Sequence, residues 1–188
     1  MSSEKVKIEI YENRMNTIDI YKKVLENVVK MLINRNVLDK SKEVAHREKL
    51  ATKIDHNLMF LIKSDYGKDD YLLKFFTQKL TTINKIPGIN DLFSQNKKVN
   101  KIIVVRDASV KAKKQFLEFD QTEIFDEKDL MIDKVSHFLV PHHRVLSGEE
   151  SAEFLKEYNL TRKELAKIKL NDPIARYYKM QVGYYLTQ

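Results

Sequence analysis

The stretch Lys101-Ile102-Ile103-Val104-Val105 decides the fold of the N-terminal part of this chain. β-Branched residues fill every position after the lysine, with no alternation of polar residues between them. Such a run predicts a strand that is buried on both faces of a sheet. Ala112, Phe116 and Phe119 follow at helical spacing, so we expect a crossover helix after the strand. A buried strand followed by such a helix indicates an α/β sheet.

Segments upstream of this strand extend the predicted sheet and cover it. Between residues 18 and 38, apolar residues recur every three or four positions and predict a helix with one buried stripe: Tyr21, Val24, Leu25, Val28 and Leu32. Residues 58–62 and 71–76 are short apolar runs next to turn-forming residues, and both predict strands. Pro87 and Gly88 predict a turn that leads into a short helix ending near Phe93.

The last fifty residues contain three helix-start signals. Two are capping boxes, which satisfy free amides at a helix start: Ser147 with Glu150, and Thr161 with Glu164. The third is Asp172 before Pro173, a capping carboxylate before a residue suited to the first helical position. We therefore predict helices beginning near residues 148, 162 and 173. With an apolar segment at residues 138–140 and a strand at residues 184–187, they form a small α+β unit.

The change of pattern places a domain boundary near Lys134, giving domains at residues 1–134 and 135–188. No glycine-, serine- or proline-rich linker marks it, and the sequence has no internal repeat.

Composition excludes several classes of protein. A chain of 188 residues with 43% hydrophobic residues can build a packed core, and no apolar run is long enough to cross a bilayer. The sequence has no cysteine, which excludes disulfides, thiolate zinc sites and a cysteine nucleophile. The first residues do not resemble a secretory signal, so we expect an intracellular protein. A net charge of +7 is compatible with work near nucleic acid, although dispersed lysines fit a solvated surface better.

Motifs for catalysis and metal binding are weak. The four glycines lie too far apart for a phosphate loop or a serine-hydrolase elbow. His137, His142 and His143 lack further local ligands for a metal, so we expect one of them to be buried and hydrogen-bonded and the others exposed. The closest match to a Mg²⁺ nuclease site is residues 126–128, Asp-Glu-Lys, with Asp107 or Asp120 upstream; a solvated, turn-like loop is the favoured interpretation. We predict no catalytic residue, metal or cofactor.

Two motifs resemble those of one family. His137-Phe138-Leu139-Val140-Pro141-His142-His143 is similar to the His-x-Leu-Val-Pro-x-His motif of the RNA polymerase subunit called subunit 5 in eukaryotes, and of its archaeal counterpart. Asp172-Pro173-Ile174-Ala175-Arg176-Tyr177 is similar to the Asp-Pro-Val-Ala-Arg-Tyr motif of the same family. The N-terminal part more loosely resembles the jaw domain of the eukaryotic protein, in its first helix, in Phe75-Phe76 and in the buried strand.

The resemblance implies a fold and a role. It implies an α/β jaw domain, like restriction nucleases but without their active site, and a small α+β assembly domain. In the family, the assembly domain docks on the largest polymerase subunit near a small partner called subunit 6, and the jaw projects toward downstream duplex DNA. The chain would thus be a non-catalytic structural subunit of a multisubunit DNA-dependent RNA polymerase.

The matched motifs supply the candidate site residues. The docking interface is predicted to involve His137, Leu139, Val140, Pro141, His143, Asp172, Pro173, Arg176 and Tyr177. Asp172 and Pro173 also cap a helix and Leu139 and Val140 also suit a core, so Arg176 and Tyr177 are the better interface candidates. Lys111, Lys113 and Lys114 are the residues predicted to lie near DNA, through phosphate contacts without sequence readout.

Departures from the family pattern accompany these matches. Ala166-Lys167 replaces Pro-Arg, and Lys179 stands where the family usually has glycine. The sequence ends at Gln188, before the closing strand pair of the family would be complete, so its sheet is expected to be short or to be completed differently or by a partner. The lysine-, asparagine- and isoleucine-rich composition suggests a divergent source such as a large DNA virus.

Two other functions remain open at this point: a free-standing metal-dependent nuclease and a generic basic DNA-binding protein. A polymerase role would place the protein in the nucleus of a eukaryotic cell, or in the host cytoplasm and the virion if the source is viral.

Overall fold

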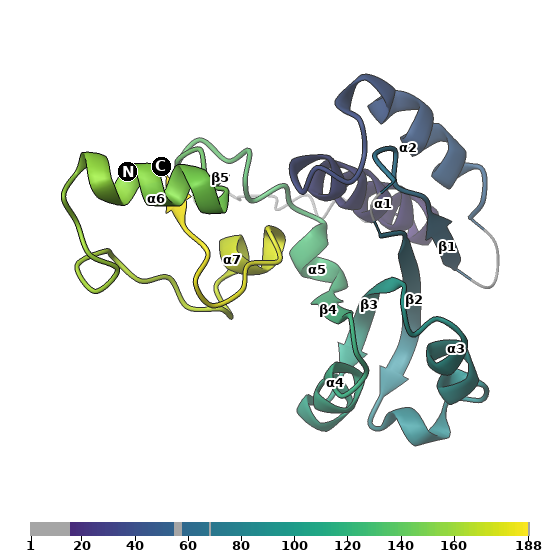
Figure 1. Cartoon of the computed structure of the whole chain (residues 1–188). Helices are drawn as coiled ribbons and strands as arrows, with labels where there is room; N and C mark the ends of the chain where they lie inside the picture. Colours follow the sequence, from purple (N-terminus) through teal and green to yellow (C-terminus); the bar gives the residue numbers. More distant parts are fainter. Residues whose placement is uncertain (1–15, 55–57, 68, 188) are drawn as a thin grey trace, which may run out of the picture.

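A computed structural model describes residues 16–54, 58–67 and 69–187 and divides them into two parts (Figure 1). The N-terminal part has a four-stranded sheet, with β1 (Met59–Ile62), β2 (Tyr71–Leu80), β3 (Asn100–Ala108) and β4 (Thr122–Asp126). Its helices are α1 (Thr17–Asn34), α2 (Glu43–Ala51), α3 (Ile89–Gln95), α4 (Val110–Leu117) and α5 (Glu127–Leu130), with 3₁₀ turns at Lys40–Lys42 and Ile83–Lys85. The C-terminal part contains β5 (Arg144–Val145), α6 (Gly148–Glu157), α7 (Pro173–Tyr177) and β6 (Leu186–Thr187).

The central strand β3 organises the larger sheet. The strand order is β1-β2-β3-β4; β3 runs parallel to β2 and β4, while β1 is antiparallel to β2. Residues 100–105 are all buried, which confirms the prediction of a strand covered on both faces. Helix α4 connects β3 to β4, as expected for a crossover between parallel strands.

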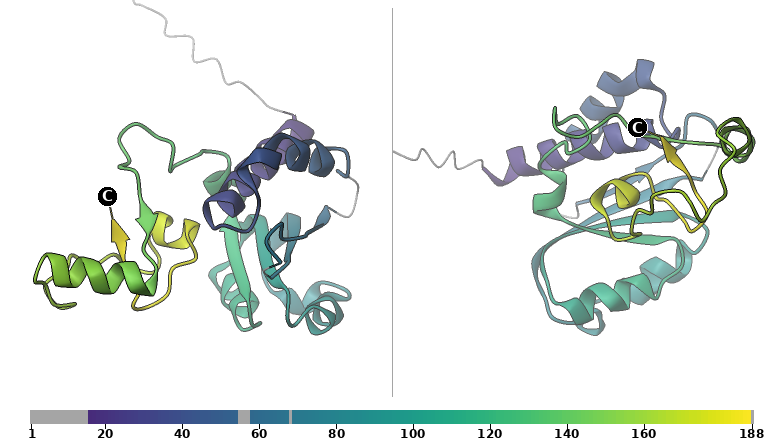
Figure 2. Two further views of the ribbon diagram at one scale, coloured as in Figure 1. Left: turned by 45° about the horizontal axis from the view of Figure 1, so that its top comes forward. Right: turned by 90° about the vertical axis from the view of Figure 1, so that its left-hand side faces the viewer.

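Two hydrophobic clusters cover the opposite faces of this sheet. Ile102 and Val104 pack in one cluster with the buried stripe of α1, and Ile103 and Val105 pack in the other with Phe116 of α4. Figure 2 shows α1 and α4 at opposite ends of the N-terminal part, with the strands between them. Successive β3 side chains therefore enter different cores, which explains why every position of the run is apolar.

Lys101 begins this apolar run and is nevertheless 1% exposed. Its ammonium donates hydrogen bonds to the carbonyl oxygens of Val99 and Asp120, at 2.9 and 3.0 Å. Burial lowers the pKa of Lys101, because the charged form loses solvation. The two carbonyls offset part of that cost and hold the start of β3 to the loop before β4.

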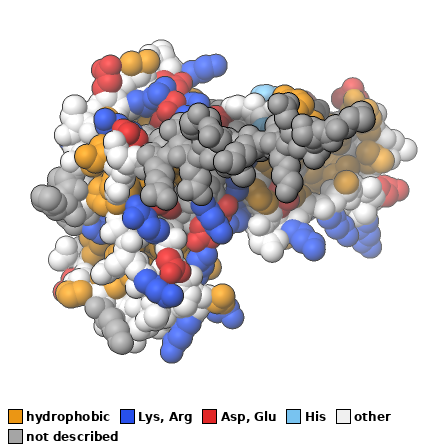
Figure 3. Space-filling view, turned by 180° about the vertical axis from the view of Figure 1, so that it is seen from behind, with side chains coloured by type: hydrophobic (Ala, Val, Ile, Leu, Met, Phe, Trp, Pro, Cys, Tyr) orange, Lys and Arg blue, Asp and Glu red, His pale blue; other side chains and the backbone are white. Residues whose placement is uncertain are grey.

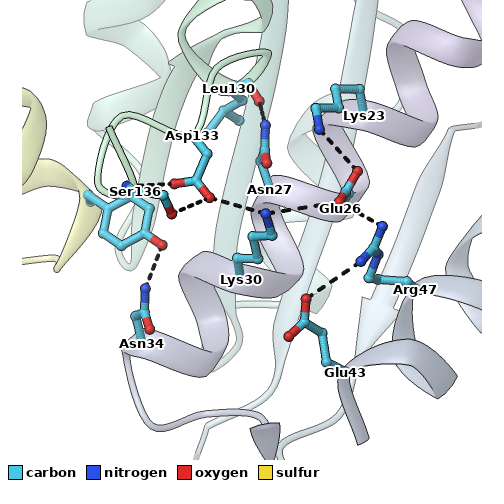
Figure 4. A network of polar contacts seen from close by, with 11 residues as sticks. Lys23, Glu26, Asn27, Lys30, Asn34, Glu43, Arg47, Leu130, Asp133 and Ser136 are labelled. Atoms are coloured by element: carbon cyan, nitrogen blue, oxygen red, sulfur yellow. Dashed lines mark hydrogen bonds and ion pairs between the residues drawn. The ribbon is translucent and has the colours of Figure 1, made fainter. Parts of the chain in front are cut away.

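Helix α1 is attached to its neighbours by polar contacts as well as by its apolar stripe (Figure 4). Asn27 donates to the carbonyl oxygen of Leu130 at 2.7 Å, and Lys30 pairs with Asp133 at 3.1 Å. On another side of the helix, Glu26 pairs with Arg47 of α2 at 2.6 Å. These contacts join α1 to α2 and to the segment that leads into the C-terminal part.

The C-terminal part differs from its prediction at three places. Helices α6 and α7 begin at the predicted residues, but the helix expected from residue 162 is absent and residues 162–165 form only a turn and a bend. The Glu164 carboxylate does accept from the amide of Thr161 at 2.6 Å, so the capping contact forms without a helix. Ile168 and Leu170 are exposed there, and a short helix without an apolar face to bury is unstable.

Residues 138–140 form a turn rather than a core segment, and β6 is limited to the last two residues of the predicted strand. Strand β6 pairs antiparallel with β5. The boundary at residue 134 lies in the connection between α5 and β5 and stays a prediction. No helix in the described ranges has the length and apolarity needed to cross a membrane.

Asp65 gives the N-terminal part a titratable contact. Its carboxylate accepts the backbone amide of Asp39 at 2.9 Å, and lies 2.8 Å from His46 and 3.1 Å from Lys42. The amide of Asp39, followed by His46 and Lys42, lowers the pKa of Asp65 to about 2, below its ordinary value of 3.8.

A carboxyl whose pKa is lower in the folded state stabilises the fold above its unfolded pKa and loses that contribution as pH falls. We therefore expect the free energy of unfolding to decrease between about pH 4 and pH 2 through Asp65. Asp65→Asn should reduce stability at pH 7 and flatten the pH dependence in that window. Urea unfolding at a series of pH values measures both effects. An unchanged acid slope in the variant would contradict this role.

Candidate interaction surface

The first matched motif lies in the connection between α5 and β5 and is mostly exposed. The amide of Val140 donates to the carbonyl of His137 at 2.8 Å, and the amide of Leu139 donates to His137 Nδ1 at 3.3 Å. The turn directs Phe138 and Leu139 outward, and their side chains are 87% and 73% exposed. The alternative expectation that Leu139 packs in a core is therefore wrong, while an exposed apolar pair is a feature of interaction sites.

The end of this motif faces inward. Pro141 and His142 are exposed, but His143 is 8% exposed, which confirms that one of the three histidines is buried. Its carbonyl oxygen accepts the hydroxyl of Tyr178 at 2.9 Å. The buried Nδ1 of His143 has no hydrogen-bond partner among the described residues, so the expected side-chain bond is not found there. The contact with Tyr178 brings the two motifs together.

The second motif begins as a helix cap. The carboxylate of Asp172 accepts the amide of Ile174 at 2.8 Å, and Pro173 occupies the first turn of α7. Ala175 is buried. The capping function predicted for Asp172 and Pro173 is confirmed. It sets the start of α7 and therefore the positions of Arg176 and Tyr177 on this helix.

Arg176 and Tyr177 contact the N-terminal part. The Arg176 guanidinium donates to the carbonyl oxygen of Ile124 in β4 and lies 4.7 Å from the centre of the Phe125 ring. The Tyr177 hydroxyl accepts from Asn34 at 2.8 Å. Both side chains thus form an interface within the chain. Their predicted contact with another subunit stays a prediction.

Arg35, at the end of α1, is the centre of this internal interface. Its side chain is only 4% exposed, and its guanidinium makes two bonds of 2.8 Å to Glu123. It also donates to the carbonyl oxygens of Tyr177 at 2.7 Å and Arg176 at 2.9 Å, at the C-terminal end of α7. Burial opposes the charge of Arg35, but Glu123 outweighs this and raises its pKa.

The lysines predicted to lie near DNA belong to α4. Lys111 and Lys114 are exposed, whereas Lys113 makes bonds of 2.6 and 2.7 Å to the two carboxylate oxygens of Asp126. Figure 3 shows lysine and arginine side chains spread over both parts and interspersed with acidic and hydrophobic ones. The structure therefore brings two of the three lysines to the surface of one helix, where they form no ion pair with the described residues.

Three of the four carboxylates considered for a nuclease site are engaged in ion pairs. Asp126 contacts Lys113, Glu127 contacts Arg106 at 3.1 Å, and Asp107 contacts Lys79 at 3.6 Å. Residues 126–128 do not form the expected loop, because Asp126 ends β4 and the following residues begin α5. Within the described part of the chain, no group of three or more potential metal ligands is found.

Comparison with known proteins identifies the family. The family described as RNA polymerase Rpb5, C-terminal domain, matches residues 132–185. DNA-directed RNA polymerase subunit 5 of Acanthamoeba polyphaga mimivirus is 31% identical over 168 residues, or 87% of this chain and 81% of the relative. This chain belongs to the RNA polymerase subunit 5 family. A further relative, subunit rpabc1 of RNA polymerases I, II and III from Dictyostelium discoideum, is 28% identical over 90% of this chain and 89% of its own length.

Membership in the subunit 5 family confirms the resemblance drawn from the two motifs, including the relationship to a viral protein. Sequence reasoning nevertheless missed Arg35, the centre of the internal interface between the two parts. Arg35 follows the apolar stripe of α1 and carries no local sign of its partners, which lie 88 and more than 140 positions further along the chain. The exposure of Phe138 was also missed, because an apolar residue in a short run resembles a core residue.

Substituting Arg35 tests how much the internal interface contributes to stability. Arg35→Met leaves Glu123 and two carbonyl groups without their partner, so we expect it to lower the free energy of unfolding by roughly 3 kcal/mol. Arg47→Met is the matched control, since Arg47 pairs with Glu26 but its side chain is 39% exposed, and it should cost less than about 1 kcal/mol. Urea unfolding compares the two. Equal losses in both variants would refute the central role of Arg35.

Proposed function

We propose that this member of the subunit 5 family is a non-catalytic, architectural subunit of a multisubunit DNA-dependent RNA polymerase. The observation that carries the proposal is the match to RNA polymerase subunits along 87–90% of this chain. The C-terminal part acts as an assembly domain that docks on the largest polymerase subunit near a small partner similar to subunit 6. The N-terminal part acts as a jaw that faces downstream DNA.

The exposed end of the first motif supports the assembly role. Phe138 and Leu139 are neighbouring large apolar side chains with most of their surface in solvent. Burying such residues against a partner gains free energy from the hydrophobic effect. The His137 ring stacks on Phe138 with centroids 4.9 Å apart, which restricts the aromatic side chain before it binds. We infer that this pair is the apolar centre of the docking surface.

The charge of the α/β part supports the jaw role. Helix α4 begins directly after the carboxyl end of β3, so Lys111 and Lys114 lie at one edge of the sheet. Free lysines on one helix attract phosphates without reading bases. The two alternatives are less favoured, because the relatives are polymerase subunits and three of the candidate nuclease carboxylates pair with Lys113, Arg106 and Lys79.

The proposed role also sets where the protein works. In a eukaryotic cell we place it in the nucleus with the polymerase. For a viral source, the host cytoplasm and the virion are the proposed locations. The mimivirus relative supports the viral alternative.

A pair of substitutions tests the docking surface. Phe138→Asp with Leu139→Asp places charges where an apolar contact is proposed, so recovery of the large polymerase subunits with the tagged chain should fall at least about tenfold. Both side chains are exposed, and the fold should be unaffected. Val44→Asp, at a 65% exposed position on α2, is the control and should preserve recovery. Normal recovery of the double variant would remove this surface from the interface.

Charge reversal tests the jaw. Lys111→Glu with Lys114→Glu should weaken the binding of assembled polymerase to downstream duplex at low salt and reduce the slope of log affinity against log salt by about 2. The control is Lys49→Glu with Lys53→Glu, an equal charge change at exposed positions in and after α2. Filter binding across a salt series measures both. Identical slopes for the two pairs would contradict a contact specific to α4.

A further inference from the structure

A cleft of about 870 Å³ separates the C-terminal part from the end of α1. One wall contains Arg35 and Tyr71 of the N-terminal part; the opposite wall contains β5, the start of α6, and Tyr184 and Tyr185. Its volume lies in the range of sites that enclose a ligand or a short peptide. The cleft is distinct from Phe138 and Leu139, which are not among its lining residues.

The charges that line this cleft are mostly positive. Arg35 and Arg144 are paired with Glu123 and Glu150. Arg162 and Lys179 form no ion pair with any described residue: the Arg162 guanidinium lies 5.9 Å from the centre of the Tyr185 ring. Glu150 is the single acidic residue along the described lining. Two cations without carboxylate partners therefore face the same cleft, which makes it complementary to negative charge.

Lys179 is held in an unfavourable conformation. Its φ of +52° lies in the left-handed region, where a side chain costs roughly 1 kcal/mol relative to glycine. The ammonium contacts Asn100 Oδ1 and lies 5.6 Å from the centre of the Tyr71 ring, and burial lowers its pKa. The left-handed φ is the geometry of a residue just after a helix C-terminus, where the amide of Met180 donates to the carbonyl oxygen of Ala175 at 2.9 Å. A ligand carboxylate compensates for the desolvation of the ammonium.

The remaining lining favours a polypeptide over a nucleic acid. Val145, Leu146 and Leu155 add an aliphatic surface that suits apolar side chains and offers nothing to phosphates. Strand β5 contributes to the same wall, and among the described strands it pairs only with β6. An extended segment can add to the edge of a strand through backbone hydrogen bonds.

We propose that this cleft receives an extended, acidic segment of another polymerase subunit, whose carboxylates pair with Arg162 and Lys179. The segment adds along the edge of β5 and places apolar side chains against Val145 and Leu155. This inference rests on the proposed function, since the partner is a subunit of the same polymerase. It adds a second contact surface with a different chemistry from the apolar pair at Phe138 and Leu139.

Cross-linking within assembled polymerase tests the proposal. A photoreactive phenylalanine analogue replaces Tyr184, whose side chain is half exposed in the cleft, and the cross-linked peptide is identified by mass spectrometry. We expect a segment of another subunit that contains Asp or Glu close to the cross-link. Arg162→Glu should lower the yield about tenfold, as should Lys179→Gly, which removes the ammonium but relieves the backbone. Lys163→Glu with Lys167→Glu changes charge outside the cleft and should leave the yield unchanged.

The possible results of cross-linking distinguish failure of the cleft proposal from failure of the proposed polymerase function. A cross-link to DNA or RNA, to residues 1–15 of this chain, or to a non-acidic segment would overturn the inference. So would an unchanged yield in both cleft variants, or the absence of any cross-link while polymerase is recovered. Failure of the wild-type chain to co-purify with polymerase would refute the proposed function itself, and this inference with it.

Discussion

One buried side chain, Arg35, joins β4 to the end of α7 and so connects the two parts of the chain. Its guanidinium meets the Glu123 carboxylate in a two-bond contact and uses its remaining donors on the carbonyls of Arg176 and Tyr177. A planar, permanently charged group with several fixed donors can satisfy a carboxylate and a helix end together, and lysine cannot. The same guanidinium bonds to Glu123 of β4 and to the last carbonyl groups of α7. It therefore holds the C-terminus of α7 close to β4.

This constraint explains why the two matched motifs serve different purposes. The second motif faces inward: Asp172 caps α7, and Arg176 then reaches the carbonyl of Ile124 on the edge strand β4. An exposed strand edge invites pairing with other chains, and the side chain of Arg176 occupies part of that edge. The first motif, held to the second through Tyr178 and His143, leaves its apolar residues in solvent. One motif therefore orients the surface that the other presents.

The sequence predicted those parts of the fold that local patterns determine. The run around Val104, the stripe of α1 and the caps at Ser147 and Asp172 each carry their structural reason within a few residues. The predictions failed where distant contacts decide. Thr161 and Glu164 form a capping contact, but no surface covers the apolar residues after them, so the helix does not form. Arg35 carried no local signal at all, since its partners come from β4 and α7.

The distribution of ion pairs also changes the meaning of the positive net charge. A count of lysines treats all of them alike, yet Lys113 is neutralised by Asp126 and the buried Lys101 is held by carbonyl groups. Charges already bound within the chain contribute little to attraction at a distance, because each is screened by its own partner. The count of 34 lysines and arginines therefore overstates the number of cations available to partners. Lys111 and Lys114 on α4, and Arg162 and Lys179 in the cleft, form no ion pair with the described residues. Because these cations belong to different parts of the chain, they can serve different partners.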